Sequence, residues 1–494
     1  MTEIAPESTP ASASKTKFVV GGAALAAVVV LGGSAAFAWE RLSGGGTQPH
    51  DVLPSSVVAY ARIDGDPSAS QKIKLLHLIR KSPQLADEIG IKDEDQDLRK
   101  TIVKAMLSDC DVDYDKHVAP WVGERFGVGL ASSGDTGFVA IQVTDEKAAR
   151  KGISLVSGCL GFGDPGVAFA KGYALIGEGQ DETEAVAKEG AKSPLAGKAS
   201  FKEDMENLGD GGIATVWADG KAFNDMMGAG FGGSATDKSL AQTRSSAASL
   251  RAGDDNIEFS GISHHTKDAP KVSPADLSAL PVNAVLAASV SGGGDQVKTQ
   301  WSTFTEAMGE FDLNGELAKI EDETGFVLPE DLETLLGDNL TLVAGDRNLA
   351  KIATFQGPED VKDLDVALAL HSDSAKAVAL ANRIVTQVSK FTGVELAVVK
   401  TKDGAVLATN KAFGSSFGKG KTLRESEAFG SVISQDDPSS GGFYLDLAKV
   451  VKVARSMDAP AAELDQVKEL KALGLSFNYE SDRVTRGTLK LSFR

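Results

Sequence analysis

The chain has 494 residues, 42% of them hydrophobic, a composition typical of a folded globular protein rather than a disordered one. Its 69 acidic and 51 basic side chains give a net charge of −18, which argues against nucleic acid as a partner and gives the surface no general attraction to anionic lipid. The length predicts more than one domain.

The N-terminal region contains an uncharged apolar run at residues 18–39, long enough as a helix to cross a bilayer. Lys15 and Lys17 precede it, so the positive-inside rule predicts a cytoplasmic tail at 1–17 and an extracytoplasmic body. We therefore expect a single-pass protein of the cell membrane. The alternative is a protein secreted after cleavage near Ala38, because Ala36-Phe37-Ala38 resembles a signal-peptidase site.

Residues 40–50 are rich in glycine and predict a linker between the membrane segment and the body. The two cysteines of the chain, Cys110 and Cys159, follow in the body and contain no C-x-x-C pattern. Two thiols cannot form a Cys-rich zinc site, and an oxidising exterior makes a Cys110–Cys159 disulfide the natural hypothesis. Two buried free thiols are the alternative.

The sequence of the body predicts an internal repeat of two similar units, at residues 51–265 and 277–494, joined by a linker at 266–276. Each half opens on a Leu-Pro pair and a strand, at 53–63 and at 280–290. Ile73, Leu76 and Ile79 have helical spacing after the first of these strands. Strands joined by hairpins and interleaved with helices predict an α+β fold with largely antiparallel sheets and flanking helices.

Further segments recur in the same order in both halves. The predicted strands are at 126–130, 138–143, 171–176 and 212–217 in the first half, and at 340–343, 366–370, 403–407 and 442–445 in the second. Helices are predicted after Glu146, Lys221, Ser374 and Leu447. Each half ends on a hairpin pattern, at 256–263 and 475–493.

Several turn and strand-start motifs resemble the uncharacterised envelope family called domain of unknown function 3352, known mainly from actinobacteria. The resemblance implies a single-pass membrane protein with no assigned activity, and it supplies no catalytic residues. The motifs are Leu53-Pro54 with Val58-Ala59-Tyr60-Ala61, Asp115 with Pro120-Trp121 and Gly123, and Leu328-Pro329-Glu330-Asp331-Leu332 with Leu335-Leu336-Gly337.

Three glycine-containing motifs imitate known sites. Residues 414–418 fit the G-x-S-x-G of hydrolases, but no histidine follows Ser416 to act as base. Gly420-Lys421-Thr422 ends like a phosphate loop, but the first glycine is one position too early, at Gly414. Residues 228–233 fit G-x-G-x-x-G, but they follow a predicted helix instead of a strand. We interpret all three as loops.

Carboxylates and histidines offer weaker candidates. Alternating aspartates at 109–115 could bind calcium, but they lack the glycine and the glutamate of an EF-hand loop, so a solvated acidic loop is the favoured interpretation. His264 and His265 point to opposite faces of a strand and would not share a metal. His117 is expected to pack beside Pro120-Trp121.

No catalytic, cofactor-binding or metal-binding residue is therefore assigned. The leading hypothesis is a non-enzymatic, membrane-anchored domain that binds or scaffolds a component of the cell envelope. The alternative is binding of an apolar or lipid ligand in a groove between the two halves. An enzyme whose site is assembled from distant residues is the third hypothesis.

Overall fold

The computed structural model describes residues 46–81, 99–100, 103–104, 107, 110–132, 137–160, 164–222, 242–268, 272–307, 313–354, 356–434, 439–457 and 459–494. The predicted tail at 1–17, the predicted membrane segment at 18–39 and the glycine-rich segment at 228–233 lie outside these residues. Within the described residues, no helix has both the length and the apolar character needed to span a bilayer.

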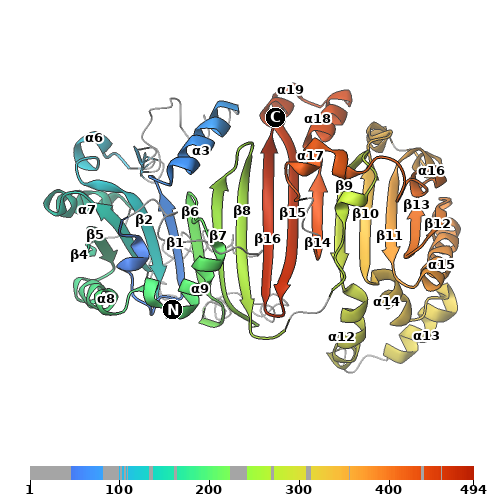
Figure 1. The fold of residues 1–494 in the computed structure, drawn as a ribbon, viewed down its shortest axis with the longest axis horizontal. Helices are drawn as coiled ribbons and strands as arrows, with labels where there is room; N and C mark the ends of the chain where they lie inside the picture. The colour runs from blue at the N-terminus through green and yellow to red at the C-terminus, as the bar shows by residue number, and fades with distance from the viewer. Residues whose placement is uncertain are drawn as a thin grey trace, which may run out of the picture. The chain divides into compact units, whose positions relative to one another are not determined.

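The chain divides into two compact units. Unit 1 comprises Met1–Ala252 and Phe259–Lys267, and unit 2 comprises Gly253–Glu258 and Asp268–Arg494. Both combine helices with antiparallel strands (Figure 1), so the predicted α+β class with largely antiparallel pairing is confirmed.

The strands of unit 1 lie in the order β4-β5-β3-β2-β1-β6-β7-β8, and the pairs from β4 to β7 are antiparallel. The first three residues of β8 are assigned to unit 2 and the rest to unit 1. Their bounds are β1 Ala59–Asp64, β2 Val122–Leu130, β3 Gly137–Val143, β4 Gly166–Ala170, β5 Tyr173–Gly177, β6 Ala214–Asp219, β7 Thr243–Ala252 and β8 Asn256–His265. Its helices are η1 Pro49–Asp51, α3 Ala69–Lys81, α6 Tyr114–His117, α7 Glu146–Leu160, α8 Gln180–Lys192, η2 Leu195–Gly197 and α9 Ala199–Leu208.

The strands of unit 2 lie in the order β12-β13-β11-β10-β9-β14-β15-β16, which matches unit 1 strand for strand. Their bounds are β9 Ala284–Ser291, β10 Asn339–Gly345, β11 Val366–His371, β12 Ala397–Thr401, β13 Gly404–Ala408, β14 Gly441–Leu445, β15 Leu470–Ser481 and β16 Val484–Phe493. Its helices are η3 Leu277–Ala279, α12 Gly293–Ala307, α13 Leu313–Thr324, α14 Glu330–Leu336, η4 Leu349–Thr354, η5 Pro358–Asp363, α15 Ser374–Thr392, α16 Lys411–Gly414, η6 Leu423–Glu425, α17 Glu427–Gly430, α18 Leu447–Ser456 and α19 Ala461–Val467.

The two Leu-Pro pairs occupy equivalent places. The carbonyl of Leu53 accepts from the N–H of Leu195 at 2.8 Å, and the carbonyl of Leu280 accepts from the N–H of Leu423 at 2.8 Å. Each proline forms one isolated bridge, since it has no N–H to continue a ladder. The strands therefore begin later than predicted, at Ala59 and Ala284.

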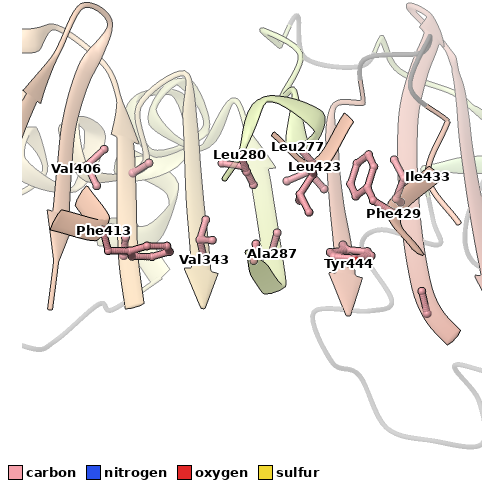
Figure 2. Close-up of a cluster of buried hydrophobic side chains, with 14 of the residues drawn as sticks. Leu277, Leu280, Ala287, Val343, Val406, Phe413, Leu423, Phe429, Ile433 and Tyr444 are labelled. Atoms are coloured by element: carbon pink, nitrogen blue, oxygen red, sulfur yellow. The ribbon is translucent and has the colours of Figure 1, made fainter. Parts of the chain in front are cut away.

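The strands of each unit have one face that is covered by a hydrophobic core. In unit 2 the strands contribute mainly small side chains, such as Ala287, Val343 and Ala369, over which Phe413 and Phe429 pack (Figure 2). In unit 1 the corresponding core contains fully buried Tyr60, Phe201 and Trp217, whose rings meet edge to face.

The helix α3 buries only part of the predicted stripe, since Ile79 is buried and Leu76 is half-buried. Ile73 is 68% exposed, whereas Leu75 and Leu78 are buried. Gln71 is buried on the same face, where its side-chain amide accepts from the N–H of Ala252 at 2.8 Å and donates to the carbonyl of the same residue at 3.2 Å. Residues at helical spacing from Gln71 then face the sheet.

Candidate functional site

The second face of the unit 1 sheet contains an apolar cavity of about 140 Å³. Its floor is a row of cross-strand neighbours, in which Ala61 pairs with Val128 and Val128 with Val139. Its walls come from the helix α7, from β2 and from the segment that precedes β2. The lining residues are Ala61, Arg62, Ile63, Val103, Leu107, Val118, Trp121, Val122, Phe126, Gly127, Val128, Val139, Ile141 and Val156.

Trp121 is the largest side chain in the wall of the cavity, and it is 4% exposed. Its indole N–H donates to the carbonyl of His117 at 2.7 Å, so its polar atom is satisfied by the backbone. The ring lies against α7 at Gly152, where a Cβ atom would fall 2.0 Å from the indole nitrogen. Only a glycine at this position lets the ring and the helix approach so closely.

The two cysteines belong to this layer of unit 1. Cys110 is disulfide-bonded and packs against the hydrophobic cluster that contains Trp121 and Phe126. Residue 159 lies in α7, but its side chain is outside the described part of the structure, so the Cys110–Cys159 pairing stays a prediction. No described cysteine is free.

The chemistry of the cavity is that of an apolar binding site. Arg62 is the one lining residue of a charged type, but its side chain points to the opposite face of β1 from Ala61 and donates from Nη1 to Oε1 of Gln48 at 2.7 Å. The remaining lining side chains are hydrocarbon or indole apart from one glycine. Such a space offers a water molecule too few polar partners and favours an apolar ligand.

A buried polar cluster lies on the other face of the sheet, since Arg62 and Asp64 alternate with Ala61 and Ile63 along β1, and it holds the first described residues of the body. Asp64, which is 1% exposed, accepts from Nε of Arg125 at 3.2 Å and lies 4.0 Å from Nη1 of Arg62. Gln48 and His50 are also buried, although the sequence assigns them to the linker at 40–50. The end of that segment is therefore packed into unit 1.

Burial dominates the titration of this cluster. It lowers the pKa of His50 to about 3, and the charge of Arg62 acts in the same direction. Burial also raises the pKa of the phenols of Tyr60 and Tyr173. Tyr173 donates its hydroxyl to the carbonyl of Thr47 at 2.8 Å, which adds another attachment for the N-terminal residues.

Several residues singled out from the sequence have structural contacts. Ser416 follows the short helix α16 instead of a strand, and its hydroxyl donates to the carbonyl of Phe413 at 2.7 Å, which is not the geometry of a nucleophile elbow. The side chain of His117 is exposed, so its predicted packing is wrong, and its carbonyl accepts from the indole N–H of Trp121.

The acidic run does not converge on one point within its described residues. Asp113 caps α6 and lies 2.7 Å from Nζ of Lys116, while Asp115 lies 2.8 Å from Nζ of Lys100. Asp109 lies outside the described residues. In the part of the chain that the structure describes, no group of three or more histidine, cysteine, aspartate or glutamate side chains could hold a metal ion.

Sequence reasoning missed a second buried network in unit 1. Asp204 is fully buried and accepts from the indole N–H of Trp217 at 2.7 Å. The other oxygen of Asp204 lies 2.5 Å from Nδ1 of His264. His265 points to the opposite face of β8, as the alternation of side chains along a strand requires. Because α9 and β8 are far apart in sequence, no local pattern could have suggested this contact.

The equivalent face of unit 2 is a partly open apolar surface. Leu342 pairs with Ala288, Ala288 with Phe443, Phe443 with Leu475, and Leu475 with Leu489. Leu342 and Leu489, at the two ends of this row, are 42% and 38% exposed. Ala288 corresponds to Ala61 in unit 1, at the floor of the cavity.

No model of a protein family matches the chain, and no curated protein matches it. Among solved structures, crystal form I of TP0453 is similar at 7% identity with a TM-score of 0.25, over 46% of this chain and 81% of that one. Crystal form IV of TP0453 is similar at 8% identity with a TM-score of 0.23, over 44% of this chain and 80% of that one. Such weak likenesses support no argument about fold or function.

Proposed function

We propose that this protein is a membrane-anchored, extracytoplasmic binding protein without enzymatic activity, and that unit 1 binds a small apolar ligand or the end of an acyl chain. The observation that carries the proposal is the cavity of about 140 Å³ between the sheet and α7. An apolar cavity of about 150 Å³ stays dry and binds benzene or xenon, so this volume suits a ligand group of similar size.

The proposed binding site lies at a different place from the one expected from the sequence. A groove between two halves was expected, whereas the cavity that supports binding lies inside unit 1. The matching strand orders support an origin by duplication, with the same apolar row serving as a cavity floor in unit 1. The membrane anchor at 18–39, the extracytoplasmic body and the relation to the domain of unknown function 3352 family are parts of the same proposal.

Benzene is a suitable probe, since a ligand that binds only the folded state raises the unfolding free energy. At ten times its Kd, the expected gain is about 1.4 kcal/mol, visible as a higher thermal midpoint. The full chain in mild detergent is titrated with benzene. Ala61→Leu fills the floor of the cavity, and this variant is expected to lose the response.

The matched control is Ala288→Leu, which makes the same change at the equivalent position in unit 2. This variant should respond to benzene like the original chain. An equal response in Ala61→Leu, or no response in any chain, would contradict binding in the cavity. Native mass spectrometry of the full chain then identifies any co-purified ligand, whose loss in Ala61→Leu is expected.

A further inference from the structure

The outer face of α7 carries three exposed cations in one row. Lys147, Arg150 and Lys151 have the spacing i, i+3, i+4, which places them on one side of the helix. A surface hollow of about 680 Å³ lies beside them, lined by Glu146, Lys147, Arg150, Lys151, Ser154 and Phe169. Phe169 belongs to β4, and the guanidinium of Arg150 lies 5.0 Å from the centre of its ring.

Several other exposed lysines of the described residues are paired with a carboxylate, unlike these cations. Lys188, Lys319 and Lys362 each pair with a glutamate on their own helix or turn. Among the described residues, no carboxylate lies within ion-pair distance of Lys147, Arg150 or Lys151. The nearby Asp145 caps α7, where its carboxylate accepts from the N–H of Ala148 at 2.9 Å.

The hollow is therefore a local positive surface on a protein of net charge −18. Three cations and one glutamate line it, which leaves an excess of positive charge available to an anionic group. Apolar surface accompanies the charge. Leu155, one turn after Lys151, is 48% exposed, and the ring of Phe169 faces the hollow. Cations beside apolar side chains are typical of helices that lie in the headgroup region of a bilayer.

The position of the predicted anchor favours a bilayer over an acidic protein as the partner. The anchor, which belongs to the proposed function, ends at residue 39, and the body is packed from Gln48 onward in the same unit as α7. The seven residues 40–46 span at most about 25 Å when fully extended. Lipid headgroups are thus held within reach of unit 1 at a high effective concentration.

We propose that the outer face of α7, with Lys147, Arg150, Lys151 and Leu155, docks on the anionic phosphate headgroups of the bilayer that carries the anchor. The inner face of the same helix contributes Val156 to the cavity wall and Gly152 to the contact with Trp121. Docking would bring the cavity within about one helix diameter, some 10 Å, of the lipid. An apolar ligand could then enter from the membrane.

The experiment uses the full chain reconstituted into vesicles, with a fluorophore on Ser154→Cys and a quencher on the lipid headgroups. Vesicles contain phosphatidylcholine alone or with about 30% phosphatidylglycerol, because each docked cation gains about fivefold in affinity from an anionic surface. We expect stronger quenching with phosphatidylglycerol and loss of the difference in about 0.5 M salt, which screens surface charge.

The variant Lys147→Glu/Arg150→Glu/Lys151→Glu should lose the phosphatidylglycerol-dependent quenching. The matched control Lys376→Glu/Lys400→Glu/Lys402→Glu makes the same charge change at exposed lysines of unit 2 and should retain it. Equal quenching in both lipid mixtures, or in both triple variants, overturns the docking proposal. The benzene titration reports separately on the cavity, since Ala61 lies on the sheet and none of the substituted cations lines that space.

Discussion

His50 is a buried neutral base in the core of unit 1. It is 3% exposed, lies 3.2 Å from the hydroxyl of Tyr60, and its ring centre is 5.2 Å from that of Phe201. Burial lowers its pKa to about 3, while the unfolded chain has the ordinary value near 6.5. Between these values only the unfolded state binds the proton, so stability falls as the pH drops through this window.

We expect His50→Gln to be less stable than the original chain at pH 7 and to lose this dependence on pH. The difference in unfolding free energy between the two should shrink by about 2 to 3 kcal/mol between pH 6.5 and pH 4.5, because each tenfold change in proton affinity between the two states corresponds to about 1.4 kcal/mol. Urea titrations at several pH values measure it. His117→Gln controls for removal of an exposed histidine, and a constant difference for His50→Gln would show that His50 titrates normally.

At the scale of single residues, the sequence indicates identity but rarely orientation. Trp121 could be singled out as a feature of the first half, yet its packing against Gly152 depends on a helix that begins 25 residues later. The buried pair Asp204 and His264 joins positions that are 60 residues apart. Such contacts are set by tertiary packing, which no local pattern encodes.

At the scale of elements, successive side chains of β10 point alternately to a buried face and to a partly exposed face of the sheet. Val343 is fully buried against the core that includes Phe413, whereas its neighbour Leu342 faces the open apolar row and is 42% exposed. Side chains alternate between faces in a strand, so this pair compares both faces of one sheet at adjacent positions.

We expect Leu342→Thr to change the unfolding free energy by no more than about 0.5 kcal/mol, as surface substitutions usually do. Val343→Thr should cost about 1 to 3 kcal/mol, because it buries a hydroxyl without a partner. Chemical denaturation measures both. Leu342→Thr should also reduce binding of a dye that senses apolar surface. Equal costs at the two positions would mean that both faces of this strand are buried.

The predicted elements match the structure best where strand and helix patterns are long. The strands at 138–143 and 366–370 and the helices after Glu146 and Ser374 agree closely with β3, β11, α7 and α15. The Leu-Pro segments were predicted as strand starts because their composition is β-like, but they are held by the backbone contacts of Leu53 and Leu280 to distant turns. The burial of the polar Gln71 on α3 likewise involves a distant partner, Ala252.

At the scale of the whole molecule, the packed N-terminal residues decide how the body is tethered. Gln48 fills a buried place against Arg62, and its N–H donates to Oδ2 of Asp51 at 2.7 Å. If residues 18–39 span the membrane, the connecting segment is 40–46, which as a coil has a root-mean-square span of about 15 Å. A force on the anchor would then be transmitted through this short segment to the sheet that forms the cavity floor.

Because the N-terminal residues are packed into unit 1, we expect only residues before Gln48 to be removable without loss of stability. A chain that begins at residue 46 should keep the thermal midpoint of the full chain in detergent, since it retains Gln48 and Asp51. A chain that begins at residue 52 loses Gln48 and His50 and leaves the buried guanidinium of Arg62 with an unsatisfied donor, which alone costs about 1 to 3 kcal/mol. It should unfold at lower temperature or fail to fold.

The substitution Gln48→Leu tests the same contact without shortening the chain. It keeps most of the side-chain volume but removes the oxygen that accepts from Nη1 of Arg62, so we expect a loss of about 1 to 3 kcal/mol in denaturant titrations. Gln356→Leu, at an exposed position in unit 2, is the matched control. If Gln48→Leu and the chain from residue 52 were both as stable as the full chain, the N-terminal segment would be a free linker and a pull on the anchor would not reach β1.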